Sequence, residues 1–209
     1  MAAPEVPIDV EPETGIWRTD GLPMIYVPRH FLVNNHRAME AALGIPAHRA
    51  ILTQSGDASA LHWCEKEAQT HGLDAEATFR HYLRRLSQRG WGRFSILALD
   101  PAAGSGRFAV EHSVYALEYG ADAGRCVCYA FEGYFTGAMR YVLRRAGCEA
   151  ALRCTEVACA AAGDRACHFV LECRDIRGHQ RSASDRDTRA PNGSEPVTKP
   201  APRRQHEWK

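Results

Sequence analysis

A stretch near the end of the chain holds most of its cysteines, together with one carboxylate. Seven of the eight cysteines lie between residues 126 and 173. Glu156 and Cys159 are three residues apart, and Cys167 follows after eight more, across a turn that contains glycine and aspartate. Three thiolates and one carboxylate can occupy the four corners of a tetrahedral zinc site. With Cys128 supplied from an upstream element, the spacing predicts a metal site of Cys128, Glu156, Cys159 and Cys167.

Two other interpretations of these cysteines stay open at this point. Cysteine is often buried as a small apolar residue, and we expect this of Cys64, Cys154 and Cys173. Disulfides are the second alternative, but the first residues lack the basic and apolar regions of a secretory signal. We therefore expect a cytoplasmic location, where clustered cysteines favour metal binding or catalysis. The spacing alone places a metal slightly ahead of buried or redox-active cysteines.

The length and composition suit one globular domain with appendages. The chain has 209 residues, of which 45% are hydrophobic, and a formal net charge of +1. This charge favours neither nucleic acid nor a membrane surface as a partner. No apolar run approaches the ~20 residues that a membrane-spanning helix requires. The common signatures of dinucleotide, phosphate and hydrolase sites are absent from the sequence.

Two motifs resemble those of the 4-vinyl reductase domain. The first, C-x(4)-G-x(3)-G, occupies residues 128–137. The second, E-x-x-C-x(3)-G-x(3)-C-x-F, occupies residues 156–169. The sequence G-W-G-R at residues 90–93 and the pair H-S at residues 112–113 add to the likeness. The resemblance covers roughly residues 49–173.

The resemblance implies a fold, a metal and several functions. Members of this family include proteins assigned as vinyl reductases of bacteriochlorophyll synthesis and the sensor halves of phenol- and xylene-responsive activators. Their fold is similar to that of TRAPP transport-particle subunits. In the aromatic-sensing members, three cysteines and a glutamate hold zinc. By resemblance, the corresponding residues here are Cys128, Glu156, Cys159 and Cys167. The segment between the two motifs is longer here than in the sensors, so Cys126, Cys148, Cys154 and His168 stay open as alternative ligands.

Sequence periodicity predicts an α+β fold of helices packed on an antiparallel sheet, with a metal-stabilised C-terminal hairpin. Helical spacing of apolar residues predicts helices over residues 29–43, 55–71, 74–89 and 126–145. Alternation predicts strands over residues 93–99, 107–119, 151–158 and 166–173, and short strands at 15–18 and 23–27. Gly133 and Gly137 allow another helix to approach the last helix closely. His36 is interpreted as a half-buried histidine with a hydrogen-bond partner.

The predicted elements and the composition divide the chain into three segments. Residues 1–28 form an N-terminal extension, of which the first 14 are rich in Pro and Glu and expected to be loose. Residues 29–176 form the 4-vinyl-reductase-like ligand-binding domain. Residues 177–209 are polar, Pro-rich and without periodicity, which predicts a disordered tail.

A ligand pocket is expected beneath the sheet. The strand predicted over residues 107–119 places His112 on the same face as Phe108. Such a histidine can anchor the polar group of a ligand in a mostly apolar pocket, and a core histidine bonded to backbone explains the pattern equally well. The resemblance favours the pocket, and we predict as its lining residues His112, Trp91, Phe108, Tyr115 and Tyr134.

These observations favour a zinc-containing domain that binds a small, largely apolar or aromatic molecule as a sensor or carrier. The resemblance implies a bacterial homodimer. No DNA-binding or ATPase region accompanies the domain, so we expect it to act through a partner protein or directly on its ligand. One alternative is a reductase of a vinyl or other hydrophobic substrate, although the sequence has no recognisable nicotinamide, flavin or iron–sulfur motif. The other alternative is a non-enzymatic scaffold.

Overall fold

The computed structural model of the chain describes residues 6–178, with side chains as far as residue 174. The first elements form a small antiparallel sheet of β1 (Asp9–Val10), β2 (Trp17–Thr19) and β3 (Leu22–Met24). The expected pair of strands is present, but Leu22 belongs to β3, and the turn lies at Asp20 and Gly21, both with positive φ. Within the first 14 residues, β1 pairs with β2. The predicted tail lies outside the described residues, except for residues 177 and 178, which end the last strand.

Three helices follow: α1 (Arg29–Leu43), α2 (Ile45–His71) and α3 (Ala75–Gln88). The predicted ends of α1 and α2 are confirmed, because Gly44 and Gly72 lie in positive-φ conformations that end each helix. The predicted start of α2 is wrong by ten residues, since the helix begins at Ile45, with a proline in its first turn, and continues through Ser55-Gly56-Asp57.

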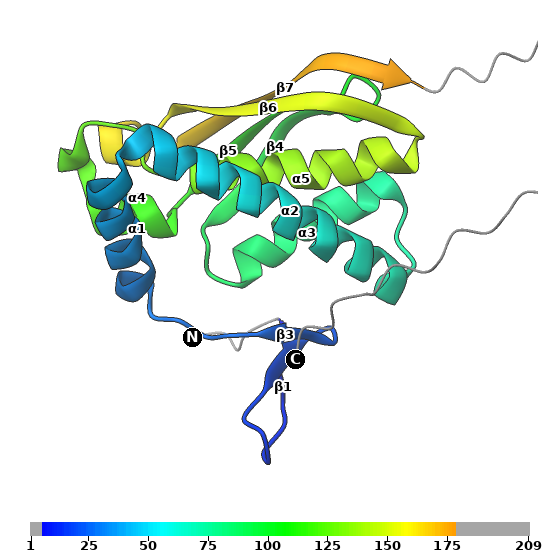
Figure 1. Ribbon diagram of the computed structural model, residues 1–209, viewed down its shortest axis with the longest axis horizontal. Helices are drawn as coiled ribbons and strands as arrows, with labels where there is room; N and C mark the ends of the chain where they lie inside the picture. The colour runs from blue at the N-terminus through cyan, green and yellow to red at the C-terminus, as the bar shows by residue number, and fades with distance from the viewer. Residues whose placement is uncertain (1–5, 179–209) are drawn as a thin grey trace, which may run out of the picture. The chain divides into compact units, whose positions relative to one another are not determined.

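The main sheet is antiparallel, with the strand order β4-β5-β7-β6. Its strands, three of them longer than predicted, are β4 (Arg93–Asp100), β5 (Ser105–Glu111), β6 (Cys148–Ala158) and β7 (Cys167–Gly178). The helix α5 (Ala130–Arg145) lies against one face of this sheet, and α2 and α3 pack on the other side of α5 (Figure 1). Helices packed on an antiparallel sheet confirm the predicted α+β class.

The segment after β5 differs from its prediction. The strand expected over residues 107–119 ends at Glu111, and His112 follows with φ 53°. Ser113 then caps the short helix α4 (Val114–Tyr119) by accepting hydrogen bonds from two backbone N–H groups. His112 is therefore exposed, and its predicted position among apolar residues on a strand face is wrong.

The core lies between α5 and the sheet. Phe135 of α5 stacks on Phe108 of β5 with ring centroids 4.3 Å apart and also packs against Phe169 of β7. On the opposite side of α5, Gly133 and Gly137 let the backbone of α2 approach closely. The helix begins at Ala130, later than predicted, because the residues before it turn toward β6.

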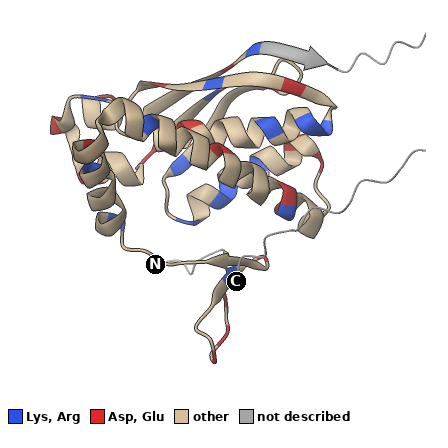
Figure 2. Cartoon of the chain, in the orientation of Figure 1, with Lys and Arg blue, Asp and Glu red and all other residues tan. Residues whose placement is uncertain are grey.

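The surface carries mixed charge. Basic and acidic residues are interspersed over the helices, as Figure 2 shows. Among the described residues, no helix has both the length and the apolarity needed to span a membrane.

Candidate metal centre

Four predicted residues meet at one end of the main sheet. Cys128 lies just before α5, Glu156 in β6, Cys159 directly after β6, and Cys167 at the start of β7. One ligand atom from each lies within 4.8 Å of those of the other three, and all four side chains are buried. The structure thus brings together the set that the sequence predicted, and their role as ligands stays a prediction.

The spacing of the three sulfur atoms matches that of a tetrahedral thiolate site. The Sγ atom of Cys128 lies 3.5 Å from that of Cys167 and 3.9 Å from that of Cys159, and the latter two are 3.7 Å apart. Zinc–sulfur bonds of about 2.3 Å in a tetrahedron place sulfur atoms about 3.8 Å from one another. A disulfide requires about 2.0 Å, and all three cysteines are free. The arrangement therefore fits one ion between the sulfurs.

The β6–β7 hairpin positions three of the four residues. An irregularity in pairing between Glu156 and Ala158 turns both Glu156 and Cys159 inward. The backbone then forms a short turn in which Gly163 has φ 98° and the Asp164 carboxylate accepts a hydrogen bond from the Cys159 N–H at 2.8 Å. This turn returns the chain so that Cys167 faces Cys159.

Burial disfavours the charged forms of Glu156 and Cys128, whereas hydrogen bonds from Cys128 and Cys167 lower the pKa of Cys159. Burial, followed by contact with Cys159, raises the pKa of Glu156 to about 9. Burial likewise raises the pKa of Cys128 well above its usual range. One carboxylate oxygen of Glu156 accepts the Cys128 N–H at 2.8 Å, whereas the other is buried without a hydrogen-bond partner. A divalent cation would supply that missing partner and favour the ionised forms.

Neighbouring groups hold the four side chains in place. The hydroxyl of Ser113 lies 2.9 Å from the sulfur of Cys128. The N–H of Ala160 donates to the sulfur of Cys167 at 3.4 Å. Glu132, which is paired with Arg49, accepts the N–H of Glu156 at 2.8 Å. Such outer contacts orient metal ligands and tune their affinity. From the sequence, Ser113 was expected on a strand and Glu132 on a helix, and neither contact was predicted.

The alternative ligands lie outside the group of four. The sulfur of Cys126 approaches the backbone oxygen of Glu156 at 3.9 Å. Cys148 lies at the far end of β6. His168 follows the first residue of β7, so its side chain points to the opposite face of the sheet, where it is half-buried.

The remaining cysteines differ in their burial. Cys64 and Cys154 are buried in the core cluster, as expected of small apolar residues. Cys173, for which the same was expected, is only partly buried, because it lies toward the end of β7.

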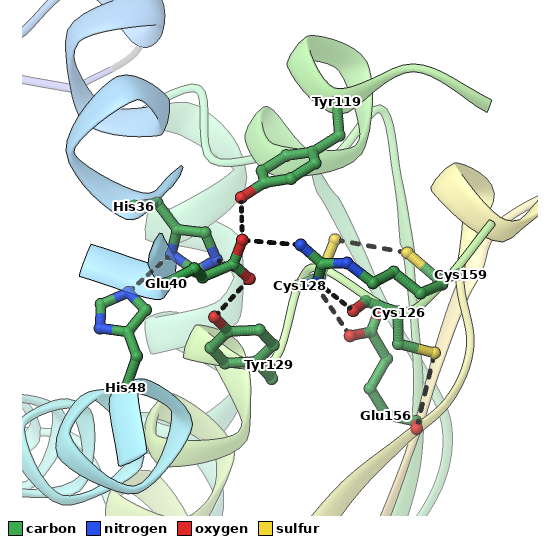
Figure 3. A network of polar contacts seen from close by, with 10 residues as sticks. His36, Glu40, His48, Tyr119, Cys126, Cys128, Tyr129, Glu156 and Cys159 are labelled. Atoms are coloured by element: carbon green, nitrogen blue, oxygen red, sulfur yellow. Dashed lines mark hydrogen bonds and ion pairs between the residues drawn. The ribbon is translucent and has the colours of Figure 1, made fainter. Parts of the chain in front are cut away.

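A partly buried polar network joins α1 to the segment that carries Cys128 (Figure 3). The Glu40 carboxylate accepts hydrogen bonds from the hydroxyls of Tyr119 and Tyr129, both at 2.7 Å, and from the guanidinium of Arg125 at 2.6 Å. Burial alone would raise the pKa of Glu40, but these three donors lower it to about 2. Glu40 therefore stays ionised and ties α1 to the chain on either side of Cys128.

His36 lies beside this network, and its lowered pKa makes the stability of the fold depend on pH. The Nδ1 atom of His36 lies 3.3 Å from Nε2 of His48, and burial lowers the pKa of His36 to about 4. In the unfolded chain the pKa is about 6.5. The unfolded state therefore binds the extra proton as the pH falls from 6.5 toward 4, and the folded state loses stability over that window.

Because of His36, we expect the free energy of unfolding to fall by about 2 kcal/mol when the pH is lowered from about 7.5 to about 5. Urea unfolding of the wild type and of His36→Gln at both pH values measures it. The wild type should lose about 2 kcal/mol more than the variant. Equal losses in the two proteins would show that His36 does not carry this dependence.

The predicted pocket residues pack against one another. Trp91, Tyr115 and Tyr134 surround Phe131 of α5, with ring centroids 5.5 to 6.2 Å from it. Phe108 lies deeper, stacked on an aromatic residue of α5. The exposed His112 instead lines an open surface hollow beside β4 and β5. Four of the five residues thus belong to the aromatic core, and their role in binding a ligand stays a prediction.

Comparisons with known proteins show the fold. The structure is similar to the phenol-responsive sensory domain of the transcription activator PoxR, solved with phenol, with a TM-score of 0.66 and 20% identity over 79% of this chain and 84% of that one. It is also similar to a trafficking protein particle complex subunit 3 from Naegleria fowleri, covalently bound to palmitic acid, with a TM-score of 0.51 and 11% identity over 70% of this chain and 95% of that one.

Sequence comparisons add one match. The model of a family described as a domain of unknown function (DUF5943) matches residues 2–97. No curated protein matches the sequence.

Proposed function

We propose that this chain is a zinc-containing domain of the 4-vinyl reductase type that binds a small, largely apolar or aromatic molecule as a sensor or carrier. The observation that carries the proposal is the likeness to the phenol-responsive sensory domain, which extends over most of both chains. The cluster of three cysteines and a glutamate supports the zinc. The domain limits of 29–176, a homodimer and a cytoplasmic location belong to the same proposal.

The zinc has a structural role in this proposal. Cys128, Glu156, Cys159 and Cys167 supply all four ligands, which leaves no open position for a substrate. The bound ion would join the β6–β7 hairpin to the start of α5. It would thereby fix the end of the helix that forms one wall of the aromatic core.

The ligand would bind at the cluster of Trp91, Tyr115, Phe131 and Tyr134. Aromatic rings offer a ligand both apolar area and specific edge-to-face contacts. Burial raises the pKa of Tyr134 to about 12, so its hydroxyl stays protonated and can donate a hydrogen bond. A phenol or a similar polar aromatic molecule fits this chemistry better than a charged one.

Calorimetric titration of the zinc-loaded protein with phenol and with toluene tests this function. We expect both to bind, and Tyr134→Phe to weaken phenol about 10-fold while toluene is unchanged, because only phenol uses the hydroxyl. Tyr26→Phe is the matched control, since Tyr26 is 86% exposed. Failure of both ligands to bind would contradict the sensor proposal, and an equal effect of Tyr134→Phe on both would contradict the role of its hydroxyl.

A further inference from the structure

A second group of metal-ligating side chains lies away from the cysteines. Glu67 and His71 are one turn apart on α2, and His81 faces them from α3. One ligand atom from each lies within 4.8 Å of the other two. Asp20 reaches the same place from the turn between β2 and β3. Glu67 and His71 are four residues apart and His81 follows ten residues later, whereas Asp20 comes from a distant part of the chain.

The distances suit coordination by nitrogen and oxygen. The Nε2 atom of His81 lies 2.8 Å, and that of His71 3.4 Å, from the same carboxylate oxygen of Glu67. An oxygen of Asp20 lies 3.6 Å from Nε2 of His71. Bonds of about 2.0–2.1 Å in a tetrahedral site place ligand atoms about 3.3 Å apart.

We propose that Glu67, His71 and His81 form a second site, for a divalent transition metal ion, with Asp20 beside it as a further oxygen ligand. Two histidines and a carboxylate are a common ligand set for zinc and related ions. Glu67 is fully buried, and its second carboxylate oxygen has no hydrogen-bond partner. The side chain of His71 is 32% exposed, which gives the ion a path from solvent.

Two arginines contact the proposed ligands and must be accommodated when a metal ion binds. Arg84 donates to Nδ1 of His81 at 2.7 Å, which places the proton of the neutral ring on Nε2 in the metal-free protein. The ion binds Nε2 in place of this proton, which moves to Nδ1, so the hydrogen bond from Arg84 must be released. Arg84 is exposed and can turn away. Arg85 pairs with Asp20 at 2.9 Å and limits the charge that Asp20 offers.

Titration of the full chain with Co²⁺ tests this site separately from the cysteine site. Cobalt at the cysteines gives sulfur-to-metal charge-transfer absorption, whereas cobalt at the histidines gives none. We expect one equivalent to bind without that absorption. His71→Ala should weaken this equivalent by more than about 10-fold and leave any sulfur bands unchanged.

His62→Ala is the matched control, because His62 is an exposed histidine on the same helix. It should bind as the wild type does. His81→Ala should reproduce the loss seen in His71→Ala. If the wild type binds no equivalent without sulfur absorption, or if both variants bind it as the wild type does, the second site is contradicted, whatever the sulfur bands show.

Discussion

Replacement of Cys159 by serine is expected to remove the proposed zinc and to lower the free energy of unfolding by about 5 kcal/mol. Cys159 lies 3.7 and 3.9 Å from the other two sulfurs, so its loss opens the site on one side. For a domain of this size the midpoint of thermal unfolding should fall by about 10–20 °C. Metal analysis and thermal denaturation of the purified variant measure the two effects.

Cys126→Ser is the control for this substitution. Cys126 is a neighbouring thiol that lies outside the group of four ligands. The variant should keep its zinc and most of its stability. If Cys126→Ser loses the metal and Cys159→Ser keeps it, the assignment of the ligands is wrong.

Replacement of Gly137 by alanine is expected to lower the free energy of unfolding by about 3 kcal/mol. A methyl group there would collide with the backbone oxygen of Asp57 and lie 2.9 Å from the Cβ atom of Ala60. In an uncrowded helix the same change is stabilising by up to about 1 kcal/mol. The sign of the effect, measured by urea unfolding, therefore reports the close approach of α2 and α5.

Gly56→Ala provides a graded comparison within the same pair of helices. Its nearest neighbours are ring atoms of Tyr134 at 3.0 and 3.2 Å, and a side chain can shift more easily than backbone. The loss of stability should be clearly smaller than for Gly137→Ala. Stabilisation by Gly137→Ala would contradict the packing of α2 on α5.

Local signals made most helix ends predictable. Gly44 ends α1, and the side chain of Asp74 caps α3 by accepting the N–H of Ala77 at 2.7 Å. The same signals misled at Ser55-Gly56-Asp57, which resemble a helix start. There the glycine serves the packing of α5 against the middle of α2, which is a tertiary contact that local sequence does not reveal.

Alternation misled at the end of β5. His112 and Val114 continue the apolar pattern of the strand, yet His112 adopts a positive φ and Ser113 begins a helix. The strand pattern was therefore extended past its true end, and a surface histidine was assigned to the pocket.

At the metal centre, the short spacing of Glu156, Cys159 and Cys167 was sufficient to predict that a hairpin brings them together. The fourth member of the group depends on how α5 meets the sheet, which is a contact between distant parts of the chain. The sequence alone therefore left several cysteines open besides Cys128.

X-ray absorption at the zinc edge, on protein carrying one tightly bound equivalent, tests the central claim most directly. The account predicts three sulfur atoms at about 2.3 Å and one oxygen at about 2.0–2.2 Å from the zinc. A shell of nitrogen and oxygen atoms alone, or a protein that binds no zinc tightly, would contradict the site of Cys128, Glu156, Cys159 and Cys167.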